Sequence, residues 1–330
     1  MAAAKADFAF LKLPLSVQQE QLERFKGICA LYGYEGFLRL QNAHVVVIGN
    51  GGVGSWIGES LCRTGVGALT LLDFDTIELS NSNRQLHTLN STLGSGKAHT
   101  LGARLKDINP YLELKTMDVQ LTRDNIAEHL AAAIGTSAAE LEALRATPLT
   151  ALHEPQNLAQ RRLKAQYGQG EAPNSLPNNV YVAEAIDDLF AKASCVDLLH
   201  RAQIPLVTSG GAGGRIDPTR VRLGDISAAK GDQLIKRLRT ELRRNYGYPK
   251  GAEGSKSAHE VGPAFNIWCS YSDEKPMRAQ DRARADLPPE QLGLPLGPNL
   301  PVFGAAVTVT ATAGLLLASA IIRWIVGERV

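Results

Sequence analysis

The chain has 330 residues, of which 44% are hydrophobic and 21% are charged, and this composition excludes a mostly disordered protein. Its 35 basic and 33 acidic side chains give a formal net charge of +2, so no global field draws the protein to nucleic acid and any basic surface must be local. The four cysteines, Cys29, Cys62, Cys195 and Cys269, form no Cys-x-x-Cys pair, which excludes a recognisable zinc site and suits a reducing compartment.

Predicted helices and strands alternate along most of the chain. The first helix carries Leu22, Phe25, Ile28 and Leu31 at helical spacing. We expect helices over residues 16–40, 55–64 and 97–108. We expect strands over residues 44–49, 67–73, 112–119, 180–186 and 204–208. This order predicts an α/β fold with a Rossmann-like, doubly wound, mostly parallel sheet and helices on both faces, followed by a loop-rich, basic C-terminal region.

The composition divides the chain into four expected regions. They are an N-terminal helical segment (1–43), a Rossmann-like core (44–214), a loop-rich, locally basic region (215–300) and a C-terminal apolar element that completes the core (301–330). Within the core, residues 134–178 are rich in alanine and then in proline, without strand periodicity. That stretch predicts a partly ordered insertion.

The C-terminal element contains an uncharged run over residues 303–322 that is long enough to cross a bilayer. Glycine, threonine and serine dilute its hydrophobicity, and residues 307–310 alternate as in a strand. We therefore predict a buried strand or helix pair. The first seven residues resemble no secretory signal. Together these features favour a cytoplasmic protein, with membrane association through 303–322 as the alternative.

A glycine-rich loop follows the strand predicted at 44–49 and opens the next helix. Gly49, Gly51, Gly52 and Gly54 permit a tight turn, and the helix N-terminus offers free N–H groups to phosphate. Asp73 ends the following strand, where an acid accepts hydrogen bonds from ribose hydroxyl groups. These features favour a bound nucleotide, and they fit an NAD-dependent dehydrogenase equally well.

A polar cluster beyond Asp73 separates the two possibilities. It consists of Asp75, Asn81, Asn83, Arg84, Gln85 and Lys97. Hydride transfer needs no such cluster, whereas attack on the α-phosphate of a triphosphate does, because negative charge shifts onto the departing pyrophosphate.

These motifs resemble the ubiquitin-activating-enzyme-like adenylating superfamily, which includes the bacterial thiamine and molybdopterin activators. The resemblance implies that residues 44–214 form an ATP-binding core and that residues 215–300 bind the substrate. Within the core, the glycine loop, Asp73, Asp75, the amides, Arg84 and Lys97 would bind ATP, and Arg84 and Lys97 would also be catalytic. The resemblance also implies that Asp187, in the sequence Glu184-Ala-Ile-Asp-Asp188, holds Mg²⁺ and is catalytic. Glu184 departs from the aspartate expected at that position.

Within the superfamily, the chain resembles the tRNA threonylcarbamoyladenosine dehydratases most closely. The likeness rests on residues 50–56, 82–87 and the string from Thr208 to Thr219. It implies ATP-dependent adenylation of the threonyl carboxylate of a modified tRNA adenosine, followed by ring closure within the same side chain. The alternative is an activating enzyme for a ubiquitin-like or sulfur-carrier protein, against which the missing zinc cysteines argue.

Other implications of the resemblance concern single residues and partners. Cys269 lies where relatives hold a cysteine, and either carries a thioester or has a structural role. Basic residues gather in the segment 236–244. They predict tRNA contacts by Lys236, Arg237, Arg239, Arg243 and Arg244. The glycine string at 209–214 is by its residues either a tight turn with positive φ angles or a bed of carbonyl groups for a monovalent cation or the substrate. A homodimer is expected, and a cysteine desulfurase or sulfur acceptor is a further possible partner.

Overall fold

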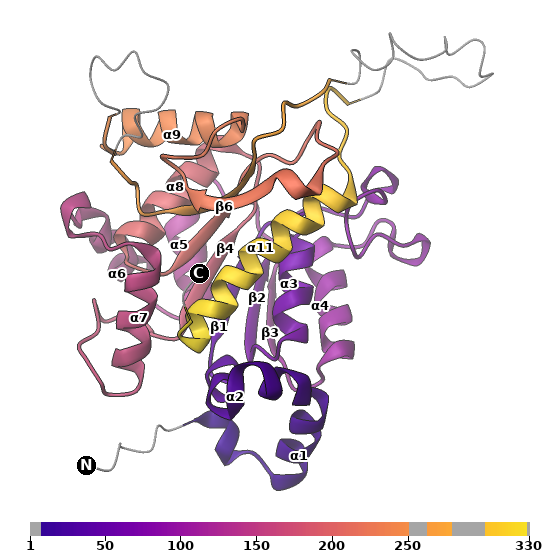
Figure 1. Cartoon of the computed structure of the whole chain (residues 1–330), viewed down its shortest axis with the longest axis vertical. Coiled ribbons are helices and arrows are strands. Elements are labelled where there is room, and N and C mark those ends of the chain that lie inside the picture. The colour runs from indigo at the N-terminus through magenta and orange to yellow at the C-terminus, as the bar shows by residue number, and fades with distance from the viewer. Residues whose placement is uncertain (1–7, 251–262, 279–300, 329–330) are drawn as a thin grey trace.

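Seven short strands form the centre of the molecule in the computed structural model, which describes residues 8–250, 263–278 and 301–328 (Figure 1). The strands are β1 (His44–Ile48), β2 (Ala68–Leu72), β3 (Glu113–Met117), β4 (Val180–Glu184), β5 (Leu206–Ser209), β6 (Val221–Asp225) and β7 (Trp268–Ser272). They pair in the order β3-β2-β1-β4-β5-β7-β6, and β6 runs antiparallel to β7 while the other pairs are parallel. The prediction of a doubly wound, mostly parallel sheet is confirmed.

Helices cover both faces because the strands bury alternate side chains on opposite sides. The helices are α1 (Leu15–Arg24), α2 (Lys26–Gln41), α3 (Gly54–Arg63), α4 (Lys97–Ile108), α5 (Ile126–Ile134), α6 (Ala138–Ala143), α7 (Pro155–Gln166), α8 (Leu189–Arg201), α9 (Gln233–Asn245) and α11 (Val307–Val326). Val46 and Ile48 of β1 pack against α5, α8 and α9, whereas Val45 and Val47 pack against α3, α4 and α11.

The N-terminal helical segment differs from the single helix that the spacing predicts. The chain leaves helical geometry at Phe25, where φ is −112° and ψ is 19°, so α1 and α2 are separate helices. Phe25 is buried with Phe37, but the break changes the helical phase and leaves Leu31 68% exposed. The expectation that Leu31 belongs to the apolar face is therefore wrong.

The stretch at 134–178 is ordered, contrary to the expectation of a partly ordered insertion. It contains α6 and α7, and Leu141 and Leu158 are buried in it. Arg162 of α7 is fully buried and donates to the carbonyl oxygens of Gln203 (2.6 Å) and Pro177 (3.0 Å). Burial lowers the pKa of this guanidinium to about 10. These hydrogen bonds attach α7 to the neighbouring backbone. The pattern of hydrophobic residues in the sequence does not reveal such an attachment, because it depends on a guanidinium group and backbone carbonyls.

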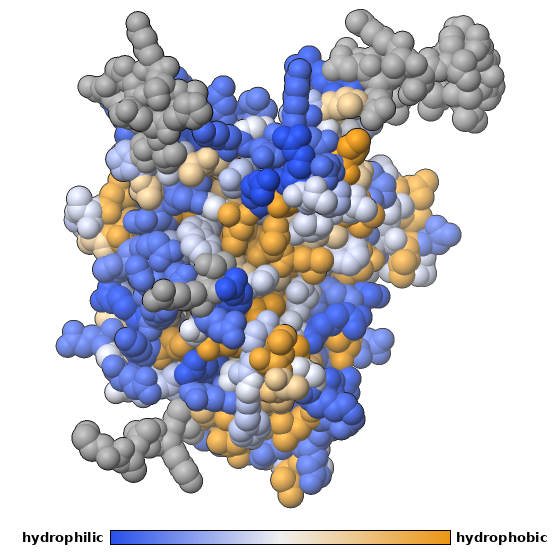
Figure 2. Space-filling model, viewed as in Figure 1, coloured by the Kyte–Doolittle hydropathy of each residue, from blue (hydrophilic) through white to orange (hydrophobic). Residues whose placement is uncertain are grey.

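The C-terminal apolar run is one 20-residue helix, α11, rather than a strand or a helix pair. Among the described residues, it is the one helix long and apolar enough to cross a membrane, and about two thirds of it is buried in the protein. Leu317 and Ile321 lie in the core, so this element completes the core as predicted. A side chain at Gly314 would place its Cβ 2.5 Å from the carbonyl oxygen of Val53, so α11 packs directly under the glycine loop. Figure 2 shows apolar side chains gathered over α11 and β6 on this face of the molecule.

The region expected to bind the substrate continues the same sheet. Its described parts supply β6, α9 and β7, and Ile235 and Leu238 of α9 pack into the core beside α8. Residues 251–262 and 279–300 of this region lie outside the described residues.

Candidate functional site

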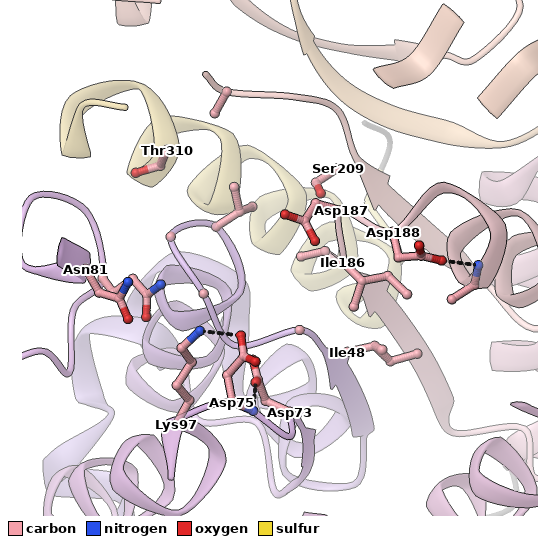
Figure 3. A pocket seen from close by; sticks show the side chains of 18 of the residues that line it. Ile48, Asp73, Asp75, Asn81, Lys97, Ile186, Asp187, Asp188, Ser209 and Thr310 are labelled. Carbon is pink, nitrogen blue, oxygen red and sulfur yellow. Dashed lines mark hydrogen bonds and ion pairs between the residues drawn. The ribbon is translucent and has the colours of Figure 1, made fainter. Parts of the chain in front are cut away.

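A cavity of about 1310 Å³ opens at the carboxyl ends of β1, β2, β4 and β5 (Figure 3). Open α/β sheets bind ligands at this edge, where the strand order reverses between β1 and β4. Its lining contains Asp187 and the predicted ATP-binding residues with one exception: Gly49, Gly51, Gly52, Asp73, Asp75, Asn81, Asn83, Arg84, Gln85 and Lys97. The structure thus brings together residues that lie up to 138 positions apart (187 − 49).

The exception, Gly54, does not line the cavity but allows the close backbone contact that shapes the glycine loop. A Cβ at Gly54 would lie 1.7 Å from the carbonyl oxygen of Gly49. Gly49 itself has φ +81°, which side chains rarely adopt, and its position would bring a Cβ to 2.9 Å from the backbone of Ala185. These two glycines therefore let β1 turn sharply into α3.

Asp73 fixes the other side of this loop. One carboxylate oxygen accepts a hydrogen bond from the backbone N–H of Asn50 (2.6 Å), and the other accepts from the N–H of Asp75 (2.9 Å). Burial raises the pKa of Asp73, while these two N–H donors oppose the rise. Each oxygen keeps a further lone pair for an outside donor such as a ribose hydroxyl group.

The two predicted cations approach the loop from separate segments. Lys97 begins α4, is 7% exposed, and its Nζ lies 2.6 Å from a carboxylate oxygen of Asp75. Arg84 lies over Gly52, where a Cβ would come within 3.0 Å of the arginine Cγ. Its Nη1 donates to the carbonyl oxygen of Ser80 (3.1 Å). Both cations are thus held beside the backbone that would carry phosphate.

Of the three predicted amide side chains, two hold the protein backbone and one has an oxygen left for a ligand. Asn81 accepts from the N–H of Glu78 (3.1 Å), and Asn83 donates to the carbonyl oxygen of Ala305 (2.7 Å), which ties this segment to the approach to α11. Gln85 is 6% exposed, and its Oε1 has no hydrogen-bond partner among the described residues. A buried acceptor of this kind needs a donor from a ligand or from water.

The acidic segment from Glu184 to Asp188 begins with a buried network of polar side chains at the end of β4. Glu184 and Lys192 are both fully buried, and the ammonium nitrogen lies 2.5 Å from a carboxylate oxygen that also accepts from the Thr208 hydroxyl (2.5 Å). The other oxygen accepts from the N–H of Ile186 (2.7 Å). Glu184 therefore fixes the turn that carries Asp187.

Asp187 and Asp188 have different roles. Asp188 caps α8 by accepting from the N–H of Ala191 (2.7 Å). Asp187 is exposed to the cavity, on the opposite side from Lys97 and Asp75 in Figure 3, and has no partner among the described residues. No group of three metal-binding side chains occurs in the described ranges. Mg²⁺ usually takes one or two carboxylates together with substrate phosphates, so the single carboxylate of Asp187 fits a Mg²⁺–ATP complex.

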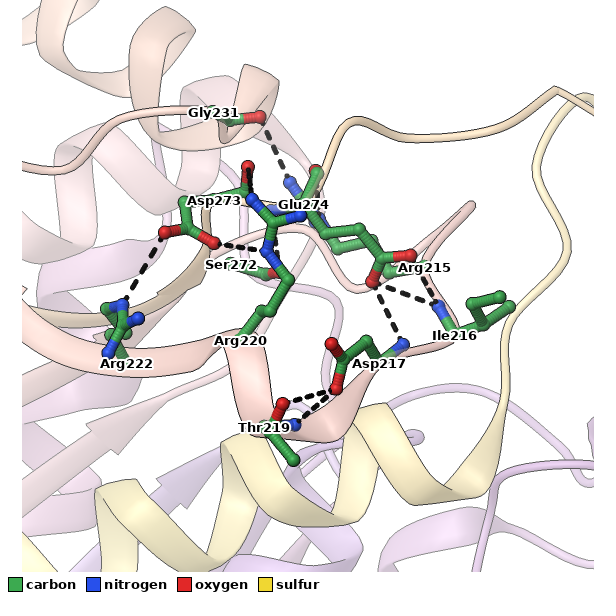
Figure 4. A network of polar contacts seen from close by, with 10 residues as sticks. All are labelled: Arg215, Ile216, Asp217, Thr219, Arg220, Arg222, Gly231, Ser272, Asp273 and Glu274. Atoms are coloured by element: carbon green, nitrogen blue, oxygen red, sulfur yellow. Dashed lines mark hydrogen bonds and ion pairs between the residues drawn. The ribbon is translucent and has the colours of Figure 1, made fainter.

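The glycine string at 209–214 forms a wall of the cavity and is anchored from behind. Asp232, the N-cap of α9, accepts from the N–H of Gly211 (3.1 Å), and Arg215 lies 3.4 Å from the same carboxylate. Figure 4 shows how Glu274, just after β7, accepts from the backbone of residues 216 and 217. These contacts connect the cavity wall directly to the start of the basic helix α9.

Cys269 lies outside the cavity lining. It is the second residue of β7 and is fully buried in the hydrophobic core. Burial raises the pKa of this thiol well above its ordinary value. Of the two alternatives that the sequence left open, the buried thiol favours a structural role over a thioester.

The predicted tRNA-binding residues of α9 differ in their exposure to solvent. Lys236, Arg237 and Arg244 are exposed and available to a partner. Arg239 instead donates to the carbonyl oxygen of Ile226 (2.9 Å), and Arg243 donates to that of Pro249 (2.9 Å). Arg243 also lies over the ring of Phe265, 5.3 Å from its centroid. These two arginines hold the chain around α9 in place.

Sequence reasoning missed the residues that follow β3. Residues 119–124 line the cavity, because the carboxyl ends of neighbouring parallel strands meet at one edge of the sheet. That rule, applied to the predicted strand at 112–119, would have found them. Phe74, Phe190, Phe303 and Thr310 also line the cavity, and no motif marks the last three.

Comparisons with known proteins agree with this geometry. Residues 26–136 match the ThiF family model. The chain is 32% identical over 297 residues to the tRNA threonylcarbamoyladenosine dehydratase of Escherichia coli K12, covering 90% of this chain and 91% of the relative. A crystal structure of the Escherichia coli enzyme with ATP aligns with TM-score 0.66 and 30% identity, covering 92% of this chain and 94% of that one. Its AMP complex aligns with TM-score 0.68 and 29% identity, covering 94% and 97%.

Proposed function

The chain belongs to the tRNA threonylcarbamoyladenosine dehydratase family, and from that premise we propose that it catalyses the ATP-dependent cyclisation of N6-threonylcarbamoyladenosine in the anticodon loop of tRNA. One observation carries the proposal for this chain. A single cavity gathers a phosphate loop, the ribose acid Asp73, the cations Arg84 and Lys97, and the free carboxylate of Asp187. At about 1310 Å³ it exceeds the usual volume of a small-molecule pocket, which leaves room for ATP and the modified nucleoside together.

The reaction has two steps. One oxygen of the threonyl carboxylate attacks the α-phosphorus of ATP, the bond to the bridging oxygen breaks, and pyrophosphate leaves. An atom of the same side chain then attacks the acyl carbon, loses its proton and displaces AMP. The net change in the nucleoside is the loss of one water. Because the attacking group is tethered to the acyl carbon, its effective molarity replaces a second substrate.

The residues of the cavity match the charges that these steps develop. The backbone N–H groups at the start of α3 face the phosphates, and Lys97 and Arg84 stabilise the negative charge that moves onto pyrophosphate. Asp187 would hold Mg²⁺, which would supply positive charge to neutralise the triphosphate. The buried thiol of Cys269 has no part in this sequence. A monovalent cation at residues 209–214 is a separate proposal, supported by the position of this glycine string in the cavity lining.

Three further proposals concern two partners and the localisation of the protein. The exposed side chains of Lys236, Arg237 and Arg244 would contact tRNA phosphates. The exposed apolar surface over α11 and β6, seen in Figure 2, would be covered by a second copy in a homodimer. Since most of α11 is buried in the core, we propose a cytoplasmic enzyme rather than one anchored through this helix.

The direct test supplies the purified protein with tRNA carrying the modified adenosine, ATP and Mg²⁺. The proposal predicts AMP and pyrophosphate in equal amounts and a nucleoside lighter by one water. An unmodified transcript of the same tRNA lacks the carboxylate and should yield no AMP. Pyrophosphate exchange that depends on a protein with a Gly-Gly tail, without any change in tRNA, would instead support the alternative function of activating a ubiquitin-like or sulfur-carrier protein.

A further inference from the structure

The phenylalanines of this chain are distributed in an unusual way. The chain has eight. Five are buried, at 7% exposure or less: Phe8, Phe10, Phe25, Phe37 and Phe265. The remaining three, Phe74, Phe190 and Phe303, are 52%, 58% and 40% exposed, and all three line the cavity described above. Single exposed apolar residues need no explanation, but three rings gathered at one cavity indicate a ligand with apolar faces.

The three rings come from different segments of the chain. Phe74 directly follows Asp73, on the ribose side. Phe190 lies in the first turn of α8, just after the Asp188 cap. Phe303 precedes α11 and packs against the glycine string, where a Cβ at Gly213 would lie 3.1 Å from the Cβ of Phe303. We call Phe190 and Phe303 the aromatic rim.

The positive charge available to RNA phosphates lies beside the cavity, on α9. The described cavity lining itself holds six acidic side chains against the three cations Arg84, Lys97 and Arg123. Leu234, at the start of α9, also lines the cavity. The exposed Lys236 and Arg237 follow Leu234 on that helix. A chain that lays its phosphates along α9 would therefore bring its bases to the mouth of the cavity.

We propose that the aromatic rim stacks the unpaired bases next to the modified adenosine, so that Phe190 and Phe303 deliver that nucleoside into the cavity. This inference rests on the proposed function. Proteins recognise single-stranded RNA loops by stacking splayed bases on aromatic side chains, and every base offers such a face. The rim then supplies affinity for the loop, while the polar residues below it act on the carboxylate.

The test uses an anticodon stem-loop RNA in which 2-aminopurine replaces an unpaired base beside the target adenosine. Binding to the wild-type protein should quench its fluorescence, because stacking on a ring quenches it. Phe190→Ala should weaken RNA binding by about 5-fold or more, as expected for loss of one stacked base. Phe303→Leu preserves packing against the glycine string but removes the ring, and should lower the quenching likewise. Phe190→Trp should restore both readouts.

The controls separate this inference from the proposed function. Leu31→Ala removes a similarly exposed apolar side chain that lies outside the cavity lining and should change nothing. The KM for ATP should be unchanged in every variant. RNA binding and quenching equal to wild type in Phe190→Ala and Phe303→Leu, with tRNA still converted, would overturn the inference alone. A raised KM for ATP with unchanged RNA binding would overturn it too, and failure of the wild-type enzyme to convert modified tRNA would overturn the proposed function.

Discussion

Removing the ammonium group of Lys192 should destabilise the protein severely, because it would leave the Glu184 carboxylate charged in a site from which water is excluded. Both side chains are fully buried and 2.5 Å apart. Breaking a buried pair from one side costs about 3–5 kcal/mol, a large fraction of the total stability of an ordinary domain. Lys192→Met is therefore expected to lower the free energy of unfolding by that amount.

A second substitution isolates the unpaired charge. Glu184→Gln added to Lys192→Met removes the charge and keeps an oxygen that accepts from the N–H of Ile186, so the double variant should be more stable than Lys192→Met alone. Lys26→Met is the matched control. Its partner Glu23 is also 2.5 Å away, but both side chains are 73% exposed, and chemical unfolding should resolve no loss.

Chemical unfolding with an unchanged m-value gives these differences directly. The single variant, where it folds, should also raise the KM for ATP, because the turn that carries Asp187 is held by Glu184. A Lys192→Met protein within about 1 kcal/mol of wild type, or a double variant less stable than the single one, would refute the reasoning.

The other predictions concern the reaction and acid stability. Lys97→Ala should abolish AMP formation and leave the circular dichroism spectrum unchanged, and normal turnover would remove its catalytic role. Cys269→Ala should retain turnover, whereas a folded but inactive variant would favour the thioester. Burial lowers the pKa of His87 to about 4 and of His200 to about 3, against about 6.5 when unfolded. The unfolded chain therefore binds more protons, and the free energy of unfolding should fall by about 2 kcal/mol for each histidine between pH 7.5 and pH 5. Urea unfolding across that range checks this, and a flat profile would contradict it.

The sheet and the predicted nucleotide-binding residues at its edge could be predicted from the sequence, because residues close together in the chain determine both. Aliphatic runs such as residues 44–48 form strands wherever both faces are covered, and Gly49 and Gly54 allow a turn that other residues cannot make. Asp73 and Lys97 follow from spacing within one motif, so their placement in the cavity was predictable as well.

What the sequence left unpredicted depends on contacts between distant segments. Nothing local distinguishes Arg239, which holds the backbone of residues 226–229, from the exposed Arg237 two positions earlier. The alternation at 307–310 predicted a strand, but these residues begin helix α11, which packs against the sheet through residues such as Leu317. Arg162 anchors residues 176 and 177 through backbone carbonyl groups, which have no sequence signature. Tertiary packing, rather than local propensity, decided each case.

The central claim is that a carboxylate becomes reactive by bonding to AMP, and the fate of one oxygen atom tests it. With ¹⁸O in the threonyl carboxylate of the modified tRNA, attack on the α-phosphorus transfers one labelled oxygen to AMP when the ring closes. Mass spectrometry of the products should therefore find the label in AMP and none in pyrophosphate. Label in inorganic phosphate, or AMP without label, would contradict the account.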